Sequence, residues 1–138
     1  IGLCPGWQGT QRLPRIVGID AALEAMLAPP ERTQAPARQA LEWGLVDACL
    51  EDRDFFAAAA RWALSKVGQE HESRKIRNMR PPTPQPGQPD AWRARMRKER
   101  KGEEAPLAII QCVEGGCAAA SFDGEVFIDA GIVAYFDF

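Results

Sequence analysis

A turn followed by a helix start is encoded in Gly2-Leu3-Cys4-Pro5-Gly6-Trp7-Gln8-Gly9-Thr10-Gln11-Arg12-Leu13-Pro14-Arg15. Pro5 and Gly6 interrupt any strand before them, and glycine lets the backbone bend and another molecule come close. Thr10 is expected to cap the helix by accepting hydrogen bonds from first-turn amides. Pro14 is tolerated because early helical amides have few intrahelical partners. Exposed amides at such a helix start favour an anion, a carbonyl oxygen or a water molecule.

Four helices are predicted in the first half of the chain from apolar spacing and from proline or glycine boundaries. The first ends at Gly18, and its expected apolar face is Leu13, Ile16 and Val17. The second is capped by Asp20, with a stripe of Leu23, Met26 and Leu27. The third opens at Pro36, turns Ala37, Ala40 and Leu41 inward and closes at Gly44, before Leu45-Val46 in a brief strand or loop. The fourth is capped by Asp52, stops at Gly68 and is expected to pack Phe55, Phe56, Ala59, Trp62, Ala63 and Val67 into the core.

The composition changes after residue 68, which divides the chain into three predicted parts. Residues 1–68 form the first part, residues 69–89 a proline-rich basic linker, and residues 90–138 a helical segment. The linker is expected to be extended and mobile because it has little to bury. In the last part, Asp90 is expected to cap a basic helix over Ala91–Lys101 with Trp92 and Met96 on one face, and Pro106 to begin another with Leu107, Ile110, Val113 and Cys117 inward. Phe122-Asp123-Gly124 is a hairpin signal, although we favour a helix there.

The composition is typical of one small globular domain. The chain has 138 residues, of which 46% are hydrophobic and 26% charged, and its formal net charge is −2. That charge argues against nucleic acid as the partner of the whole chain, and no apolar run approaches membrane-spanning length. Four cysteines without Cys-x-x-Cys spacing and a single histidine, His71, predict no metal site and reduced thiols. The expected compartment is therefore cytoplasmic.

The opening stretch resembles the crotonase family, the enoyl-CoA hydratases and isomerases, whose signature here is Pro-Gly followed by Gly-Gly-Thr-Gln-Arg-Leu. The likeness continues through Val17-Gly18, Ala21-Ala22-Leu23-Glu24 and Ala40-Leu41-Glu42-Trp43-Gly44-Leu45-Val46-Asp47. Gln8 replaces the first glycine of the family's pair, and the Ala28–Gln34 connection is longer than usual. The resemblance implies a chain that is mostly α, the later part of a crotonase-type α/β (ββα spiral) domain, followed by the linker and C-terminal helices.

A narrower resemblance lies beyond the linker. The residues that carry it are Trp92-Arg93-Ala94-Arg95-Met96, Lys98 to Lys101, Ala105-Pro106-Leu107-Ala108-Ile109-Ile110 and Cys112-Val113-Glu114. They are similar to the part of multifunctional fatty-acid oxidation enzymes that follows the hydratase domain and leads to a 3-hydroxyacyl-CoA dehydrogenase domain. No Gly-x-Gly-x-x-Gly unit is present, so no nicotinamide site and no cofactor are expected, and a coenzyme A thioester is the implied substrate.

Hydration of an enoyl thioester needs donors for the enolate oxygen and carboxylates that ionise water. The resemblance places both family glutamates before Ile1, so no catalytic carboxylate is expected here and the chain alone is predicted to be inactive. Gly6 matches the glycine whose amide helps hold the catalytic water; the alternative is a glycine needed only for the turn. The expected substrate-binding residues are Pro5, Gly6 and Trp7, although Trp7 could instead pack in the core.

Other polar residues receive structural interpretations. Glu24, Glu42 and Glu51 are expected on solvated helix faces, Cys4 as a buried inert thiol, and His71 in solvent. The basic residues are Arg74, Lys75, Arg77, Arg80, Arg93, Arg95, Arg97, Lys98, Arg100 and Lys101. They could contact coenzyme A phosphates, meet nucleic acid or an acidic partner, or form a solvated face, which we favour.

The sequence therefore predicts part of an enoyl-CoA hydratase, which converts 2-enoyl-CoA to 3-hydroxyacyl-CoA in fatty-acid β-oxidation, within a multifunctional enzyme. The alternatives are a stand-alone hydratase or isomerase relative and a non-catalytic helical interaction module. The expected partner is an acyl-CoA substrate, together with a homo-oligomer or the remainder of the same enzyme. Residues 105–138 are expected to fold back as a cover over the acyl-CoA site, because their apolar side chains need burial.

Overall fold

The computed structural model describes residues 5–29, 35–50 and 53–119, and all regular structure in these ranges is helical. The α-helices are α1 (Gly9–Val17), α2 (Ile19–Leu27), α3 (Ala37–Glu42), α4 (Phe55–Leu64), α5 (Gln88–Glu99) and α6 (Ala105–Ala118). Two short 3₁₀ turns, η2 (Glu72–Arg74) and η3 (Ile76–Asn78), lie between α4 and α5. The prediction of a mostly helical chain is confirmed for the described residues, whereas the expected terminal hairpin or helix lies outside them.

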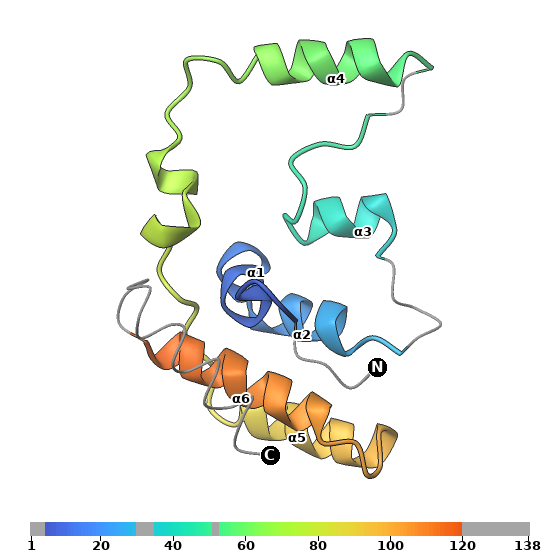
Figure 1. The fold of residues 1–138 in the computed structure, drawn as a ribbon, viewed down its shortest axis with the longest axis vertical. Helices are drawn as coiled ribbons and strands as arrows, with labels where there is room; N and C mark the ends of the chain where they lie inside the picture. Colours follow the sequence, from blue (N-terminus) through green and yellow to red (C-terminus); the bar gives the residue numbers. More distant parts are fainter. Residues whose placement is uncertain (1–4, 30–34, 51–52, 120–138) are drawn as a thin grey trace.

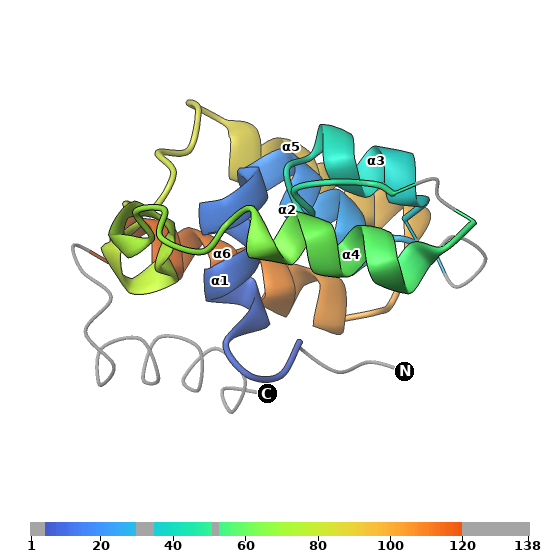
Figure 2. The same cartoon turned by 90° about the horizontal axis from the view of Figure 1, so that it is seen from above.

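The core lies where the two ends of the described chain meet. Helices α1 and α2 pack on α6, and α6 packs on α5; this unit lies in the lower part of Figure 1 and behind α4 in Figure 2. The buried apolar cluster is made by Ile19, Leu23, Leu27, Trp92, Met96, Ile109, Ile110 and Val113. The stripes predicted for α2 and α6 and the Trp92–Met96 face of α5 are thus confirmed. Segments far apart in sequence form one packed unit, from which α3 and α4 project.

Helices α3 and α4 lie away from this core and touch none of the other described helices (Figure 1). Phe55 is 54% exposed, Phe56 85% and Val67 76%, so the prediction that α4 packs them into the core is wrong for this chain. Only Ala58 of α4 is buried. Leu41 is exposed in place of the inward position expected for it, and Leu45-Val46 form an exposed loop. The predicted helices are present, but no other described helix packs against the apolar side chains of α3 and α4.

The buried face of α1 also differs from the expected one. Thr10, Gln11, Pro14 and Arg15 are buried, whereas Ile16 is 37% exposed and Leu13 and Val17 are only partly covered. The choice of Leu13, Ile16 and Val17 as the inward face is therefore wrong. The polar side chains can be inward because they hydrogen-bond to backbone carbonyls there, as described below.

Four expected helix caps are placed differently. Thr10 lies inside α1, whose cap position is Gln8 without a side-chain hydrogen bond. Asp20 lies in the first turn of α2, where it accepts from Trp92. The cap of α4 is Asp54, not Asp52, and its Oδ1 accepts from the Ala57 amide at 3.3 Å. Helix α5 begins at Gln88 after Gly87 (φ 76°), which leaves Asp90 inside its first turn. In each case a residue two or three positions away, whose backbone is not helical, occupies the boundary.

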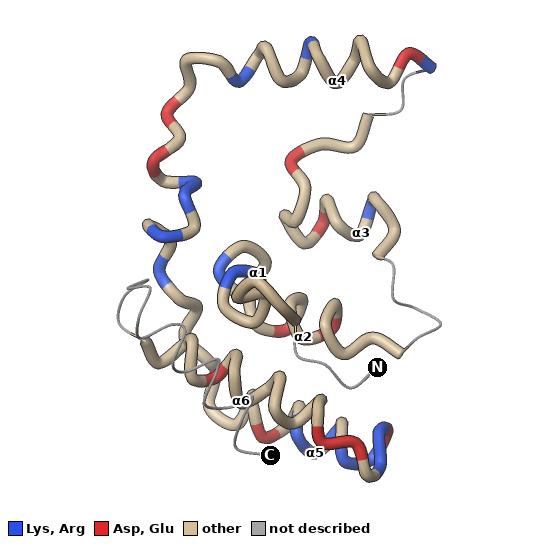
Figure 3. The backbone as a smooth tube through the Cα atoms, viewed as in Figure 1, with Lys and Arg blue, Asp and Glu red and all other residues tan. Residues whose placement is uncertain are grey.

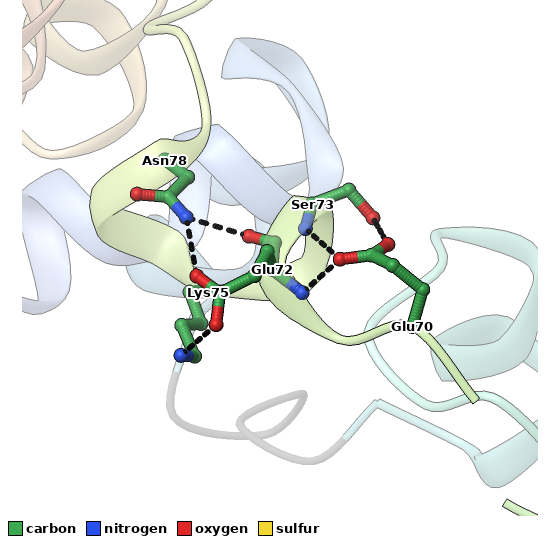
Figure 4. A network of polar contacts seen from close by, with 5 residues as sticks. All are labelled: Glu70, Glu72, Ser73, Lys75 and Asn78. Atoms are coloured by element: carbon green, nitrogen blue, oxygen red, sulfur yellow. Dashed lines mark hydrogen bonds and ion pairs between the residues drawn. The ribbon is translucent and has the colours of Figure 1, made fainter. Parts of the chain in front are cut away.

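Residues 69–89 are more structured than the expected extended linker. Glu70 accepts from the amides of Glu72 and Ser73 and from Ser73 Oγ, which is 2.8 Å from Oε2, and these bonds close η2 (Figure 4). Lys75 pairs with Glu72, and Asn78 donates to the Glu72 carbonyl at 2.7 Å. Turn η3 packs against α1, and Arg74 pairs with Asp47. Residues 80–85 form no helix or turn, as the prolines predict.

Candidate functional site

The candidate site is the turn from Pro5 to Gly9 that precedes α1. The Gly9 amide donates to the Gly6 carbonyl at 3.0 Å, and the Gln11 and Arg12 amides both donate to the Gln8 carbonyl at 2.9 Å. Gly9 cannot carry a side chain here, because an added Cβ would lie 2.8 Å from Pro5 Cβ. The turn is thus tightly closed just before the first helical residue.

Gly6 is exposed, and an added Cβ there would meet nothing within 4 Å. Its φ also lies outside the left-handed region. The described chain therefore gives no reason of its own why residue 6 must be a glycine, which weakens the interpretation that it serves only the turn. The hypothesis that its amide holds a water molecule stays a prediction.

Trp7 projects from the turn and is 96% exposed. Its backbone is left-handed, with φ 55°, and Gln8 follows with φ 61°. Core packing of Trp7, one of the two alternatives, does not occur in the described chain. The indole is instead presented outward beside Pro5 and Gly6, so the three expected substrate-binding residues are adjacent on one exposed loop.

Sequence reasoning missed the roles of Gln11 and Arg15, which join α1 to α6. Gln11 Nε2 donates to the Cys112 carbonyl at 2.6 Å, and Arg15 donates to the Gln11 carbonyl at 2.8 Å and the Gly116 carbonyl at 3.3 Å. Burial lowers the pKa of the Arg15 guanidinium and raises the pKa of the Cys117 thiol nearby. Both shifts favour the neutral forms, which gives no support to a reactive thiolate here. The missed signal was the spacing: residues 11 and 15 are one turn apart on one helix face.

The carboxylates of the chain are engaged elsewhere or exposed. Glu24 pairs with Arg95 at 2.9 Å, so it lies in an ion pair and not on a freely solvated face. Glu42 is exposed as expected, and Glu51, like Cys4, lies outside the described residues. Among the residues described, no glutamate reaches the Pro5–Gly9 turn through a hydrogen bond. The expectation that the chain contributes no catalytic carboxylate stays a prediction.

The predicted basic residues lie in two separate regions, one around η2 and η3 and one on and just after α5 (Figure 3). Five members are ion-paired: Arg74 with Asp47, Lys75 with Glu72, Arg93 with Asp90 and Glu114, Arg95 with Glu24 and Glu99, and Arg100 with Glu103. The hydrogen bonds that Arg93 donates to Glu114 and that Arg95 donates to Glu24 raise the pKa values of the two guanidinium groups. Arg77, Arg80, Arg97, Lys98 and Lys101 are exposed, and none forms an ion pair within the ranges described. Two of these residues, Arg93 and Arg95, therefore join α5 to other helices, α6 and α2 respectively.

Trp92 takes part in the link between α5 and α2. Its Nε1 donates to Asp20 Oδ1 at 2.8 Å, and the Arg95 guanidinium lies over its ring, 4.8 Å from the centroid. Arg95 also binds Glu24 of α2, so indole and guanidinium together fasten α5 to α2. His71 is exposed, as expected.

Two further kinds of site were searched for in the described ranges. No group of His, Cys, Asp or Glu is arranged there to hold a metal ion. None of the helices that the structure describes has the length and apolar content needed to span a bilayer.

Comparison with known proteins finds relatives that cover most of the chain. It is 36% identical over 116 residues, 82% of its length, to a peroxisomal bifunctional enzyme of Danio rerio. It is 33% identical over 134 residues, 84% of its length, to a glyoxysomal fatty acid beta-oxidation multifunctional protein of Cucumis sativus. It is 32% identical over 133 residues, 86% of its length, to a fatty acid oxidation complex subunit alpha of Shewanella amazonensis.

These homologues are multifunctional enzymes of fatty-acid β-oxidation, in agreement with the narrower of the two resemblances. The chain spans only 16%, 16% and 17% of their respective lengths. No protein-family model matches the chain.

Proposed function

We propose that this chain is part of the enoyl-CoA hydratase unit of a multifunctional β-oxidation enzyme. The observation that carries the proposal is the likeness to such enzymes over 82–86% of the chain, including residues on both sides of the linker. Continuity across the linker favours a multifunctional enzyme over a stand-alone hydratase or isomerase. The crotonase-type fold of the whole unit and its acyl-CoA substrate are parts of this proposal.

The exposed apolar residues support a chain that completes a larger domain. Phe55, Phe56, Leu64 and Val67 of the α4 region are more than half exposed, and Trp7 is almost fully exposed. Monomeric proteins rarely leave such clusters in water. In the proposed enzyme they pack against the remainder of the hydratase domain or line its acyl pocket.

The role assigned to this chain in hydration is to hold water and substrate. The Gly6 amide donates to the water that adds across the double bond, and Pro5 and Trp7 contact the acyl-CoA. The glutamates that activate this water, and the amides that bind the thioester oxygen, belong to other parts of the enzyme. Cytoplasm stays our prediction for the compartment, with the peroxisome as the alternative that two relatives' names suggest.

The experiment compares two substitutions of Gly6 in the longer protein that carries this chain, assayed for hydration of a short 2-enoyl-CoA. Gly6→Ala keeps the amide hydrogen and adds a Cβ that meets nothing within 4 Å in the described chain. Gly6→Pro removes the amide hydrogen. We expect Gly6→Pro to lower kcat about 100-fold, on the scale of removing one aligned donor, and Gly6→Ala to lower it far less.

Equal, small effects of both substitutions would contradict the role of the Gly6 amide. Acyl-CoA binding by the longer protein is measured as well, to separate an enzyme from a non-catalytic interaction module. A longer protein that neither hydrates enoyl-CoA nor binds an acyl-CoA would favour the interaction module.

A further inference from the structure

Helix α1 is joined to α6 by two polar side chains that donate hydrogen bonds to backbone carbonyls of α6. Gln11 and Arg15, one turn apart on α1, donate to the carbonyls of Cys112 and Gly116, one turn apart on α6. The two donors are four residues apart on α1 and the two acceptors are four residues apart on α6, so the two hydrogen bonds lie one helical turn apart. Gln11 is 1% exposed and Arg15 9%, so both hydrogen bonds are shielded from water.

Gly116 provides the space in which the Gln11 amide lies. A Cβ added at residue 116 would be 1.4 Å from Gln11 Oε1, 2.2 Å from Cδ and 2.5 Å from Nε2. The amide therefore occupies the volume that any side chain at position 116 would need. Gln11 Oε1 is buried and has no N–H or O–H donor among the described residues, so a Cα hydrogen of Gly116 is what faces it.

We propose that the inward face of α1, formed by Thr10, Gln11, Pro14 and Arg15, is a docking surface that accepts α6 in a single register, selected by the glycine at position 116. A slide of one turn would place Cys112 beneath the Gln11 amide, and its Cβ would collide there. The register is thus set by exclusion at Gly116, because a Cβ in its place would collide with the Gln11 amide. The two carbonyl contacts hold the helices together but do not select the register, since α6 offers backbone carbonyls at every turn.

This docking explains the glycine at position 116 of α6. Glycine disfavours a helix, so Gly115-Gly116 weakens α6. At position 116 the absence of a side chain makes room for the Gln11 amide. Because α1 directly follows the Pro5–Gly9 turn, a fixed α6 register also fixes the position of that turn relative to α6. The inference does not depend on the proposed hydratase function.

A double-mutant cycle on the 138-residue chain tests the proposal, with Gly116→Ala, Gln11→Ala and the combined variant. The measurements are the amide hydrogen exchange of Ile109 to Val113 and the urea midpoint. We expect Gly116→Ala alone to speed exchange roughly 10- to 100-fold, on the scale of overpacking a close contact, and to lower the midpoint. Gln111→Ala, at an exposed position of the same helix, is the control and should leave both measurements unchanged.

The combined variant decides the outcome. With the Gln11 amide gone, the alanine methyl has room, so adding Gly116→Ala to Gln11→Ala should leave exchange unchanged or slow it. If Gly116→Ala is harmless alone, or equally damaging with and without Gln11, no such selection exists and the proposal is overturned. A combined variant that fails to fold while Gln11→Ala folds has the same meaning.

Discussion

Trp7 and Gln8 are consecutive non-glycine residues in left-handed backbone conformations, with φ of 55° and 61°. Each such residue costs roughly 1–2 kcal/mol relative to an ordinary conformation. Gln8 stands where the crotonase signature has a glycine, which would adopt this φ without penalty. Residue-scale strain is therefore concentrated in the turn that carries the candidate site, as is common for functional loops.

Replacing Gln8 by glycine should stabilise the chain by about 1 kcal/mol, because the backbone conformation is kept and the Cβ penalty is removed. The measurement is the free energy of unfolding from urea titration. Gln111→Gly is the matched control at an exposed helical position, and there the same exchange should cost about 0.5 kcal/mol. Equal destabilisation at both positions would show that residue 8 is not held at positive φ.

At the scale of elements, η2 depends on one carboxylate. Glu70 accepts hydrogen bonds from Ser73 Oγ and from the amides of Ser73 and Glu72, and these bonds lower its pKa. A carboxyl whose pKa is lowered by folding stabilises the fold above its unfolded pKa, about 4.3 for glutamate. That contribution is lost as the pH falls through the lower, folded pKa. The turn should therefore stay intact at neutral pH and open only in acid.

The Ser73 amide proton should report this titration in an NMR pH series. We expect its chemical shift to change at a pH below the ordinary glutamate range, and Glu70→Ala to abolish the change. Glu42→Gln, at an exposed position of α3, removes one charge and should leave the Ser73 titration as it is. A Ser73 shift that follows an ordinary glutamate pKa would mean that Glu70 does not close η2.

Helix α4 is the element whose sequence and environment disagree most. Its aromatic spacing predicts burial, yet Phe56 is 85% exposed. In the 138-residue chain, Phe56→Ala should change the free energy of unfolding by less than about 0.5 kcal/mol. Leu23→Ala in the core should cost about 2–5 kcal/mol.

The same Phe56 substitution should cost about 3–5 kcal/mol in the longer protein, if the rest of the proposed hydratase domain buries the ring. Urea titration of both proteins provides the comparison. A small effect in both would show that α4 is exposed in the enzyme too.

The sequence predicted the helices well and their environments less well. Periodicity and glycine or proline boundaries located every described helix to within a few residues, and Leu23, Trp92, Met96, Ile110 and Val113 were correctly assigned inward. The face of α1 was missed because its buried side chains are polar, and polar burial depends on the α6 carbonyls, which no local pattern reveals. At the candidate site, the sequence could name Pro5, Gly6 and Trp7 by resemblance. It could not show that they share one exposed loop.

At the scale of the whole molecule, residues from both sides of the linker form one core. Helices α1 and α2 pack on α6, which packs on α5, whereas α3 and α4 project from this core with exposed apolar side chains. This organisation agrees with the likeness to multifunctional enzymes, which also spans both sides of the linker. In our proposal, the core holds the Pro5–Gly9 turn in place and the projecting part meets the rest of the hydratase domain.

Hydration of crotonyl-CoA, measured side by side for the 138-residue chain and for the longer protein that contains it, tests this proposal most directly. We predict no enzymatic turnover by the chain, because our proposal places the two carboxylates that activate water outside it, and turnover by the longer protein. Turnover by the chain alone that is abolished by Glu24→Gln or Glu42→Gln would contradict the assignment of catalysis to residues outside this chain. Absence of hydration by the longer protein would contradict the proposed function itself.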